Sequence, residues 1–178
     1  MTQSMRIVLS FCLLTSMVVT SNARAQVPGP QPEHAKLKSM EGKWKFVLRA
    51  ADGSESPGTN ESKLECGGLW LISDFKTTFG GAPFQGHGMD GYDSAKKKYV
   101  TIWVDSLTSA PMIFEGDFDS TGKILTMTSE AQGPTGQPAK WRSVTKIVSE
   151  NEHTFEMFLT PKDGKELSMM TVTYKRDK

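Results

Sequence analysis

The chain has 178 residues, with 21 lysines and arginines, 20 aspartates and glutamates, and a formal net charge of +1. A nearly neutral chain has no basic surface of the kind that attracts nucleic acid or an anionic membrane, so we expect neither as a partner. Of the two cysteines, Cys12 and Cys66, only Cys66 lies beyond residue 25. An intrachain disulfide is therefore excluded in residues 26–178, where we expect Cys66 to be a small buried apolar residue.

Residues 1–25 have the features of a secretory signal peptide. Arg6 precedes a short apolar stretch over residues 7–19, and Ala23-Arg24-Ala25 has the small-x-small pattern of a cleavage site. The apolar stretch is shorter than the roughly 20 residues of a transmembrane helix. We therefore expect cleavage near Ala25, export to the periplasm or the extracellular space, and no membrane span in the mature chain.

Residues 26–32 contain three prolines and a glycine, which predicts an extended tether. Residues 33–40 have the length and pattern of one or two helical turns, and residues 45–50 form the first expected strand. Asp52-Gly53 predicts a turn. We expect residues 54–60 to form a polar loop, followed by strands over residues 61–66 and 69–79 that are separated by Gly67-Gly68.

The centre of the chain predicts a β-hairpin. A glycine-rich arm ends at Tyr92, a polar turn spans residues 93–98, and a second arm runs from Tyr99 to Asp105. In that second arm, residues 100, 102 and 104 alternate with residues 99, 101, 103 and 105, which is the period of a strand. Both sets contain large side chains, which favours a curved or closed sheet over a flat solvated one.

Further strands are expected over residues 111–119, 124–131, 139–149, 154–160 and 166–175, with a turn every 8–14 residues by this reading. No helix long enough to connect parallel strands lies between them. The sequence thus predicts an all-β protein, an antiparallel up-and-down β-barrel of about ten strands with a short N-terminal helix. Residues 33–178 would form this single domain.

Two sets of motifs resemble known families. Gly42-Lys43-Trp44 near the start and Arg176 near the end resemble the calycin superfamily of lipocalins and fatty-acid-binding proteins. That resemblance implies that Trp44 closes one end of the barrel and that the cation of Arg176 lies across its indole.

A second resemblance covers residues 37–176 and is carried by an ordered series of motifs. These are Glu65-Cys-Gly-Gly-Leu-Trp-Leu-Ile-Ser-Asp74, Gly81-x-Pro-Phe-x-Gly86, Gly91-Tyr-Asp93, Trp103-x-Asp105-Ser106 and Tyr174-Lys-Arg176. They are similar to the bacterial exported family called domain of unknown function 1579. This resemblance implies a calycin-like barrel and no particular activity.

The sequence contains no recognisable catalytic or cofactor-binding motif. None of the histidines His34, His87 and His153 has the spacing of a metal ligand, so we expect no metal site and no cofactor. His87 is the best placed of the three, since it could point inward beside Met89. Asp105 ends a strand on the face that carries Trp103. It could be a polar anchor paired with Lys140 or Arg142, or it could cap the loop over residues 106–109.

We therefore expect an exported barrel that binds a small apolar or amphipathic molecule in its interior. The expected lining residues are Met89, Trp103, Met112, Phe114, Trp141 and Met157, with Asp105 and Arg142 as polar anchors. A one-residue error in register would exchange the inner and outer faces of any strand.

Two other hypotheses remain open at this stage. An interaction module would have a filled barrel and would use its rim loops, such as residues 54–60 and 133–138. An enzyme would need convergent titratable groups. The only candidate set of catalytic groups in the sequence is Asp105, His87 and Arg142.

Overall fold

The computed structural model describes residues 29–162 and 164–178. The expected signal peptide, residues 1–25, and residues 26–28 of the tether lie outside the described residues. Within the described part, none of the helices has the length and apolar character needed to cross a membrane.

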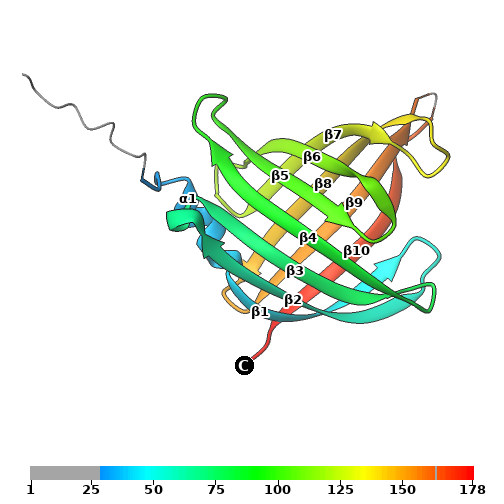
Figure 1. Ribbon diagram of the computed structural model, residues 1–178, viewed down its shortest axis with the longest axis horizontal. Coiled ribbons are helices and arrows are strands. Elements are labelled where there is room, and N and C mark those ends of the chain that lie inside the picture. Colours follow the sequence, from blue (N-terminus) through cyan, green and yellow to red (C-terminus); the bar gives the residue numbers. More distant parts are fainter. Residues whose placement is uncertain (1–28, 163) are drawn as a thin grey trace, which may run out of the picture.

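Ten antiparallel strands form a closed barrel (Figure 1). Each strand pairs with the next along the chain, and β1 also pairs with β10, so that no edge is left open. The predicted fold class is confirmed. The strands are β1 (Gly42–Ala50), β2 (Glu55–Glu65), β3 (Trp70–Phe79), β4 (Ala82–Asp93), β5 (Lys98–Asp105), β6 (Thr108–Phe118), β7 (Ile124–Gln132), β8 (Pro138–Ser149), β9 (Glu152–Pro161) and β10 (Leu167–Arg176).

Alternation along the strands separates the two faces of the barrel wall. In β1, Trp44, Phe46 and Leu48 are buried, while the residues between them are exposed. The expected hairpin is formed by β4 and β5, with Gly88 opposite Trp103 and Asp90 opposite Thr101. Tyr99, Thr101, Trp103 and Asp105 face inward, so residues 100, 102 and 104 lie on the outer face.

Two local predictions are wrong. Residues 55–60 belong to β2 instead of a polar loop, because they pair with β1 from Glu55↔Arg49 to Asn60↔Trp44. Tertiary pairing overrides their polar composition there. Cys66 is exposed, with φ of 51°, because it opens the short 3₁₀ turn η2 (Cys66–Gly68) between β2 and β3.

The N-terminal helical turns cover one end of the barrel, as Figure 1 shows. They are α1 (His34–Leu37) and the 3₁₀ helix η1 (Lys38–Met40). Leu37 is fully buried in the cluster that contains Leu71 and Tyr99. The Tyr99 hydroxyl donates a hydrogen bond of 3.0 Å to the Glu33 carbonyl. This end of the barrel is therefore sealed by apolar packing and by a tyrosine that reaches across from β5.

Arg176 fixes the same end. Its guanidinium carbon lies 4.1 Å from the centroid of the Trp44 ring. The guanidinium also donates to the backbone carbonyls of Glu41 and Glu150, at 2.8 and 2.9 Å. Gly42 has φ of 127°, and a Cβ there would lie 2.3 Å from Arg176 Nη1. The G-x-W pattern is thus explained, since only glycine leaves room for the guanidinium beside the indole.

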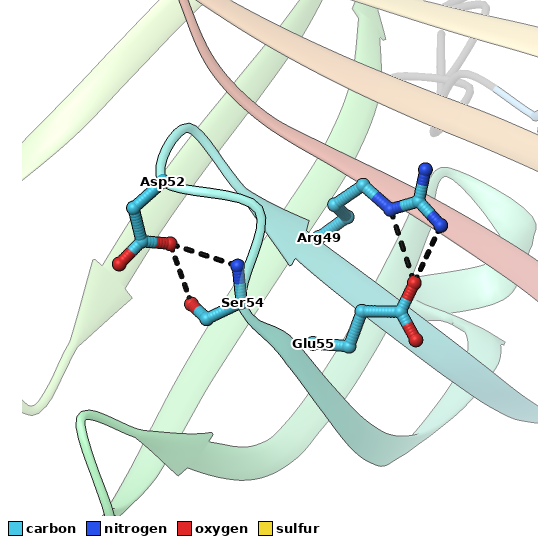
Figure 2. A network of polar contacts seen from close by, with 4 residues as sticks. All are labelled: Arg49, Asp52, Ser54 and Glu55. Atoms are coloured by element: carbon cyan, nitrogen blue, oxygen red, sulfur yellow. Dashed lines mark hydrogen bonds and ion pairs between the residues drawn. The ribbon is translucent and has the colours of Figure 1, made fainter.

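The hairpins at the opposite end are held by exposed polar contacts. Figure 2 shows Arg49 Nε donating to Glu55 Oε1 at 3.0 Å, and Asp52 Oδ1 accepting from the Ser54 amide at 2.9 Å. Both side chains of the ion pair are at least half exposed. Such pairs contribute little to stability.

These two arginines therefore make a matched test. Arg176→Ala should lower the free energy of unfolding by about 2–3 kcal/mol, because it removes charged hydrogen bonds to backbone carbonyls and a cation–π contact. Arg49→Ala should lower it by less than about 1 kcal/mol. Urea unfolding followed by tryptophan fluorescence measures both. Equal losses in the two variants would contradict the role given to Arg176.

Candidate ligand-binding cavity

The interior of the barrel encloses a cavity of about 500 Å³, and all ten strands contribute to its wall. Most of the wall is made of aromatic, leucine and methionine side chains. At the end opposite α1, the wall includes Phe79, Leu107 and Pro134, which are all exposed. Because these three residues border both the cavity and the solvent, they mark its mouth.

An aromatic group forms the wall near the mouth. Phe75 stacks on Phe46 at 4.2 Å between ring centroids and meets the edge of Trp103 at 5.8 Å. The indole of Trp103 lies against the inner face of β4, where a Cβ on Gly86 would come within 2.2 Å of it. Trp103 Nε1 donates to Asp105 Oδ2 at 2.9 Å, which fixes the ring. The Gly86–x–Gly88 pattern of β4 therefore makes room for a large ring on the neighbouring strand.

A polar stripe crosses β2 and β3 on the same inner surface. Asn60 Nδ2 donates to Ser62 Oγ at 2.9 Å, and the hydroxyls of Ser62 and Ser73 are 2.8 Å apart. Asn60 is 9% exposed, and its Oδ1 is the one buried side-chain oxygen or nitrogen without a partner in the part of the chain that the structure describes. An unpaired buried acceptor lowers the free energy of unfolding by about 1–3 kcal/mol, so Asn60 Oδ1 destabilises the barrel.

Asp90 is the neighbouring acidic group on the cavity wall. It lies on β4 and accepts a hydrogen bond from the hydroxyl of Thr101 on β5. The carboxylate is accessible only in part because it faces the cavity, and its removal from water raises the pKa of Asp90 to about 6. Asp90 is therefore ionised at neutral pH. The free energy lost when its charge leaves water is only partly recovered by the hydrogen bond from the Thr101 hydroxyl.

His153 and Tyr174 adjoin the cavity beside the Trp44 plug. The two rings stack at 4.3 Å, and His153 meets the edge of Trp44 at 4.4 Å. Burial, with a smaller contribution from the charge of Arg176, lowers the pKa of His153 to about 4. Burial also raises the pKa of Tyr174 far above its ordinary value. Both groups are neutral at pH 7, so they add no charge to the cavity.

Six of the eight predicted ligand-binding residues border the cavity: Trp103, Asp105, Met112, Phe114, Trp141 and Met157. The other two, Met89 and Arg142, lie on the outer face. Met89 follows Gly88 in β4, and Arg142 follows Trp141 in β8, so strand alternation turns both outward. Arg142 instead pairs with Glu166 at 2.6 Å, and its guanidinium lies over the ring of Phe158. The expectation that Met89 and Arg142 point inward is therefore corrected.

The partners expected for Asp105 and the inward orientation considered for His87 are also corrected. Asp105 pairs with neither Lys140 nor Arg142. Its Oδ1 accepts from the amides of Leu107 and Thr108, so it caps the loop after β5 while Oδ2 holds Trp103. His87 points outward, where its Nδ1 lies 2.6 Å from Asp74 Oδ1. The set considered for catalysis, Asp105, His87 and Arg142, is thus divided between the two faces of the wall.

Sequence reasoning missed Asn60, Ser62, Ser73 and Asp90. For Asp90 the signal was present, since the turn over residues 93–98 places it opposite Thr101 once the hairpin register is drawn. Asn60 was hidden because polar residues 54–60 read as a loop. Small polar side chains on an inner face do not alternate with the polar residues of the outer face, so the sequence pattern does not reveal which way they point.

The ten-strand closed barrel, its plugged end and its internal cavity define a lipocalin-like β-barrel. The chain belongs to the family described as protein of unknown function (DUF1579), whose model matches residues 29–176. No curated protein matches the sequence.

Two solved structures share the architecture. Rv2717c from M. tuberculosis has a TM-score of 0.60 at 12% identity, over 83% of this chain and 99% of that chain. The S-type phycobiliprotein lyase CPES from Guillardia theta has a TM-score of 0.51 at 10% identity, over 84% of this chain and 99% of that chain. At such identities the likeness shows the fold alone.

The titration of Asp90 and His153 predicts two opposed effects of pH on stability. The pKa of Asp90 is about 6 in the folded chain and 3.8 ordinarily, so stability falls as pH rises from 4 to 6. The pKa of His153 is about 4 against 6.5, so stability rises with pH through nearly the same window. Each effect is about 3 kcal/mol.

Asp90→Asn removes the first effect and leaves the second. Its free energy of unfolding, measured in urea at pH 4, 5, 6 and 7, should therefore rise with pH by about 3 kcal/mol more than that of the unmodified protein. Glu130→Gln, an exposed substitution on β7, is the control and should leave the profile parallel. A parallel profile for Asp90→Asn as well would disprove the burial of this carboxylate.

Proposed function

We propose that this protein is an exported carrier that holds one small apolar or amphipathic molecule inside its barrel. The observation that carries the proposal is the cavity of about 500 Å³, which is within the range of small-molecule sites and is walled by large apolar side chains. A barrel whose role was structural would be expected to fill its interior with side chains. The mouth at Phe79, Leu107 and Pro134 supplies a route for the ligand.

The form of the wall supports one small ligand over an extended chain threaded through the barrel. The end beneath α1 is closed by Leu37, Trp44 and Tyr99, and among the described residues the cavity wall reaches solvent at the other end, at Phe79, Leu107 and Pro134. Methionines from four strands, Met112, Met127, Met157 and Met170, border the cavity. Their unbranched side chains adapt to guests of different shape. An interaction module with a filled barrel fits these features less well.

Export is part of the proposal and rests on the sequence of residues 1–25. A carrier that acts outside the cytoplasm needs no disulfide here, because β1 closes the sheet on both sides and Arg176 secures the plug. The tether over residues 26–32 would separate the barrel from the cleavage site.

Filling the cavity should abolish binding. N-phenyl-1-naphthylamine, an apolar probe that fluoresces when shielded from water, should bind the unmodified protein with one-to-one stoichiometry. Met112→Trp places an indole in the cavity and should weaken this binding at least tenfold. Ile113→Trp, the adjacent residue on the outer face and 51% exposed, should leave it unchanged. Fluorescence titration measures all three. Absence of probe binding by the unmodified protein, or equal binding by both variants, would refute an internal site.

Export predicts a defined N-terminus. Protein recovered from the periplasm or the medium of the producing cell should have an intact mass that corresponds to a chain beginning at Gln26. Ala23→Arg and Ala25→Arg together should leave the full-length chain in the cell, because the cleavage site requires small residues. A full-length mass for the unmodified protein would contradict the signal peptide.

A further inference from the structure

The charged side chains on the cavity wall are acidic. Among the described residues that line it, two are aspartates, Asp90 and Asp105, and none is a lysine or an arginine. His153 is neutral at pH 7 for the reason given above. Asp105 has both oxygens engaged, by Trp103 and by the loop amides. Asp90 is therefore the charged group that remains available to a guest.

Asp90 has little protein compensation for its charge. The hydroxyl of Thr101 is the only donor to this carboxylate among the residues described. Solvation of a buried carboxylate by one hydroxyl is poor, as its pKa of about 6 indicates. A ligand cation or donor at this point would replace the missing solvation.

Asn60 supplies an independent indication of the same chemistry. Its amide nitrogen is used by Ser62, so the group left unpaired on the cavity wall is the carbonyl oxygen Oδ1. Oδ1 can only accept a hydrogen bond. Two separate side chains, one charged and one neutral, thus lack a donor at the same wall.

The strand register sets the two acceptors apart along the barrel. Ser62 lies opposite Ser73, and Ser73 lies opposite Gly88. Asn60 lies two residues from this row toward the mouth and Asp90 two residues from it toward the plugged end, so each is a diagonal neighbour of Ser73 at about 7–8 Å and neither is a neighbour of the other. A Cβ on Gly88 would lie 3.5 Å from the Trp103 ring, so the indole covers this part of β4. Asp90, opposite Thr101, therefore lies one row deeper in the cavity than the Trp103 indole.

We propose that Asp90 selects amphipathic ligands whose polar end is a primary amine and that it discriminates against carboxylates. The apolar body would lie against the aromatic and methionine wall, and the ammonium would donate to Asp90. A carboxylate in the same place would meet the charge of Asp90 with no cation nearby. This inference rests on the proposed function, because it names the class of ligand for the same cavity.

A series of ligands with one chain length tests the selection. Decylamine, decanol and decanoate are compared at pH 7.5 by displacement of N-phenyl-1-naphthylamine and by isothermal titration calorimetry. Decylamine should bind at least tenfold more tightly than decanoate, with decanol between them. Equal or tighter binding of decanoate would overturn the amine selection while leaving the carrier function intact. Failure of the fluorescent probe and of all three ligands to bind would instead refute the carrier function.

Substitutions identify the groups responsible. Asp90→Asn keeps the shape and removes the charge, so the ratio of decylamine to decanoate affinity should fall at least tenfold while decanol binding changes little. Asp74→Asn, on the outer face of β3, is the matched control and should keep the ratio. An unchanged ratio in Asp90→Asn would overturn the assignment of this carboxylate.

Discussion

The pairing of β1 with both β2 and β10 is the constraint on which the other features depend. It joins the two ends of the sheet, so each strand has a neighbour on both sides and a defined inner and outer face. Ten strands in this arrangement surround more space than their inward side chains occupy. The cavity is thus a consequence of strand number and closure, and the side chains decide only its shape and chemistry.

Closure of the sheet does not close the ends of the barrel, and the two ends differ. At one end, Trp44, Leu37 and the Arg176 guanidinium fill the opening, and their contacts join residues that are more than 130 positions apart in the chain. At the other end, hairpin loops carry exposed ion pairs such as Arg49–Glu55, and Phe79 and Leu107 remain accessible. Stability is concentrated at the plugged end. The ion pair described at the end through which a ligand would pass is exposed, and such pairs contribute little to stability.

The sequence determined the architecture well because the signals for it are local and repeated. Turn residues at regular spacing gave the strands, and Gly42-x-Trp44 with Arg176 gave the plug. The cavity wall was predicted less completely, for two physical reasons. Because side chains alternate between the two faces with a period of two, Gly88 and Trp141 on the inner face leave Met89 and Arg142 on the outer face. The sequence prediction placed Met89 and Arg142 inside because of their side-chain types, without a known register. The polar part of the wall is contributed by Asn60, Ser62, Ser73 and Asp90, whose types are common in loops and become informative only after the register is known.

Three costs to stability coincide on that part of the wall. Asp90 is held in a poorly solvating site, Asn60 Oδ1 lacks a partner, and the adjoining space is empty of side chains. Each is the type of defect that a single substitution to an apolar residue would repair, since buried polar groups that lack partners are destabilising. Asp90 and Asn60 lie on the two sides of one polar row of the wall, whereas elsewhere on the wall Asp105 has both oxygens bonded, and His153 and Tyr174 stack on each other. A defect that arose from loose packing would have no reason to place poorly satisfied acceptors against a cavity, whereas a site that receives a donor from outside the chain requires them there.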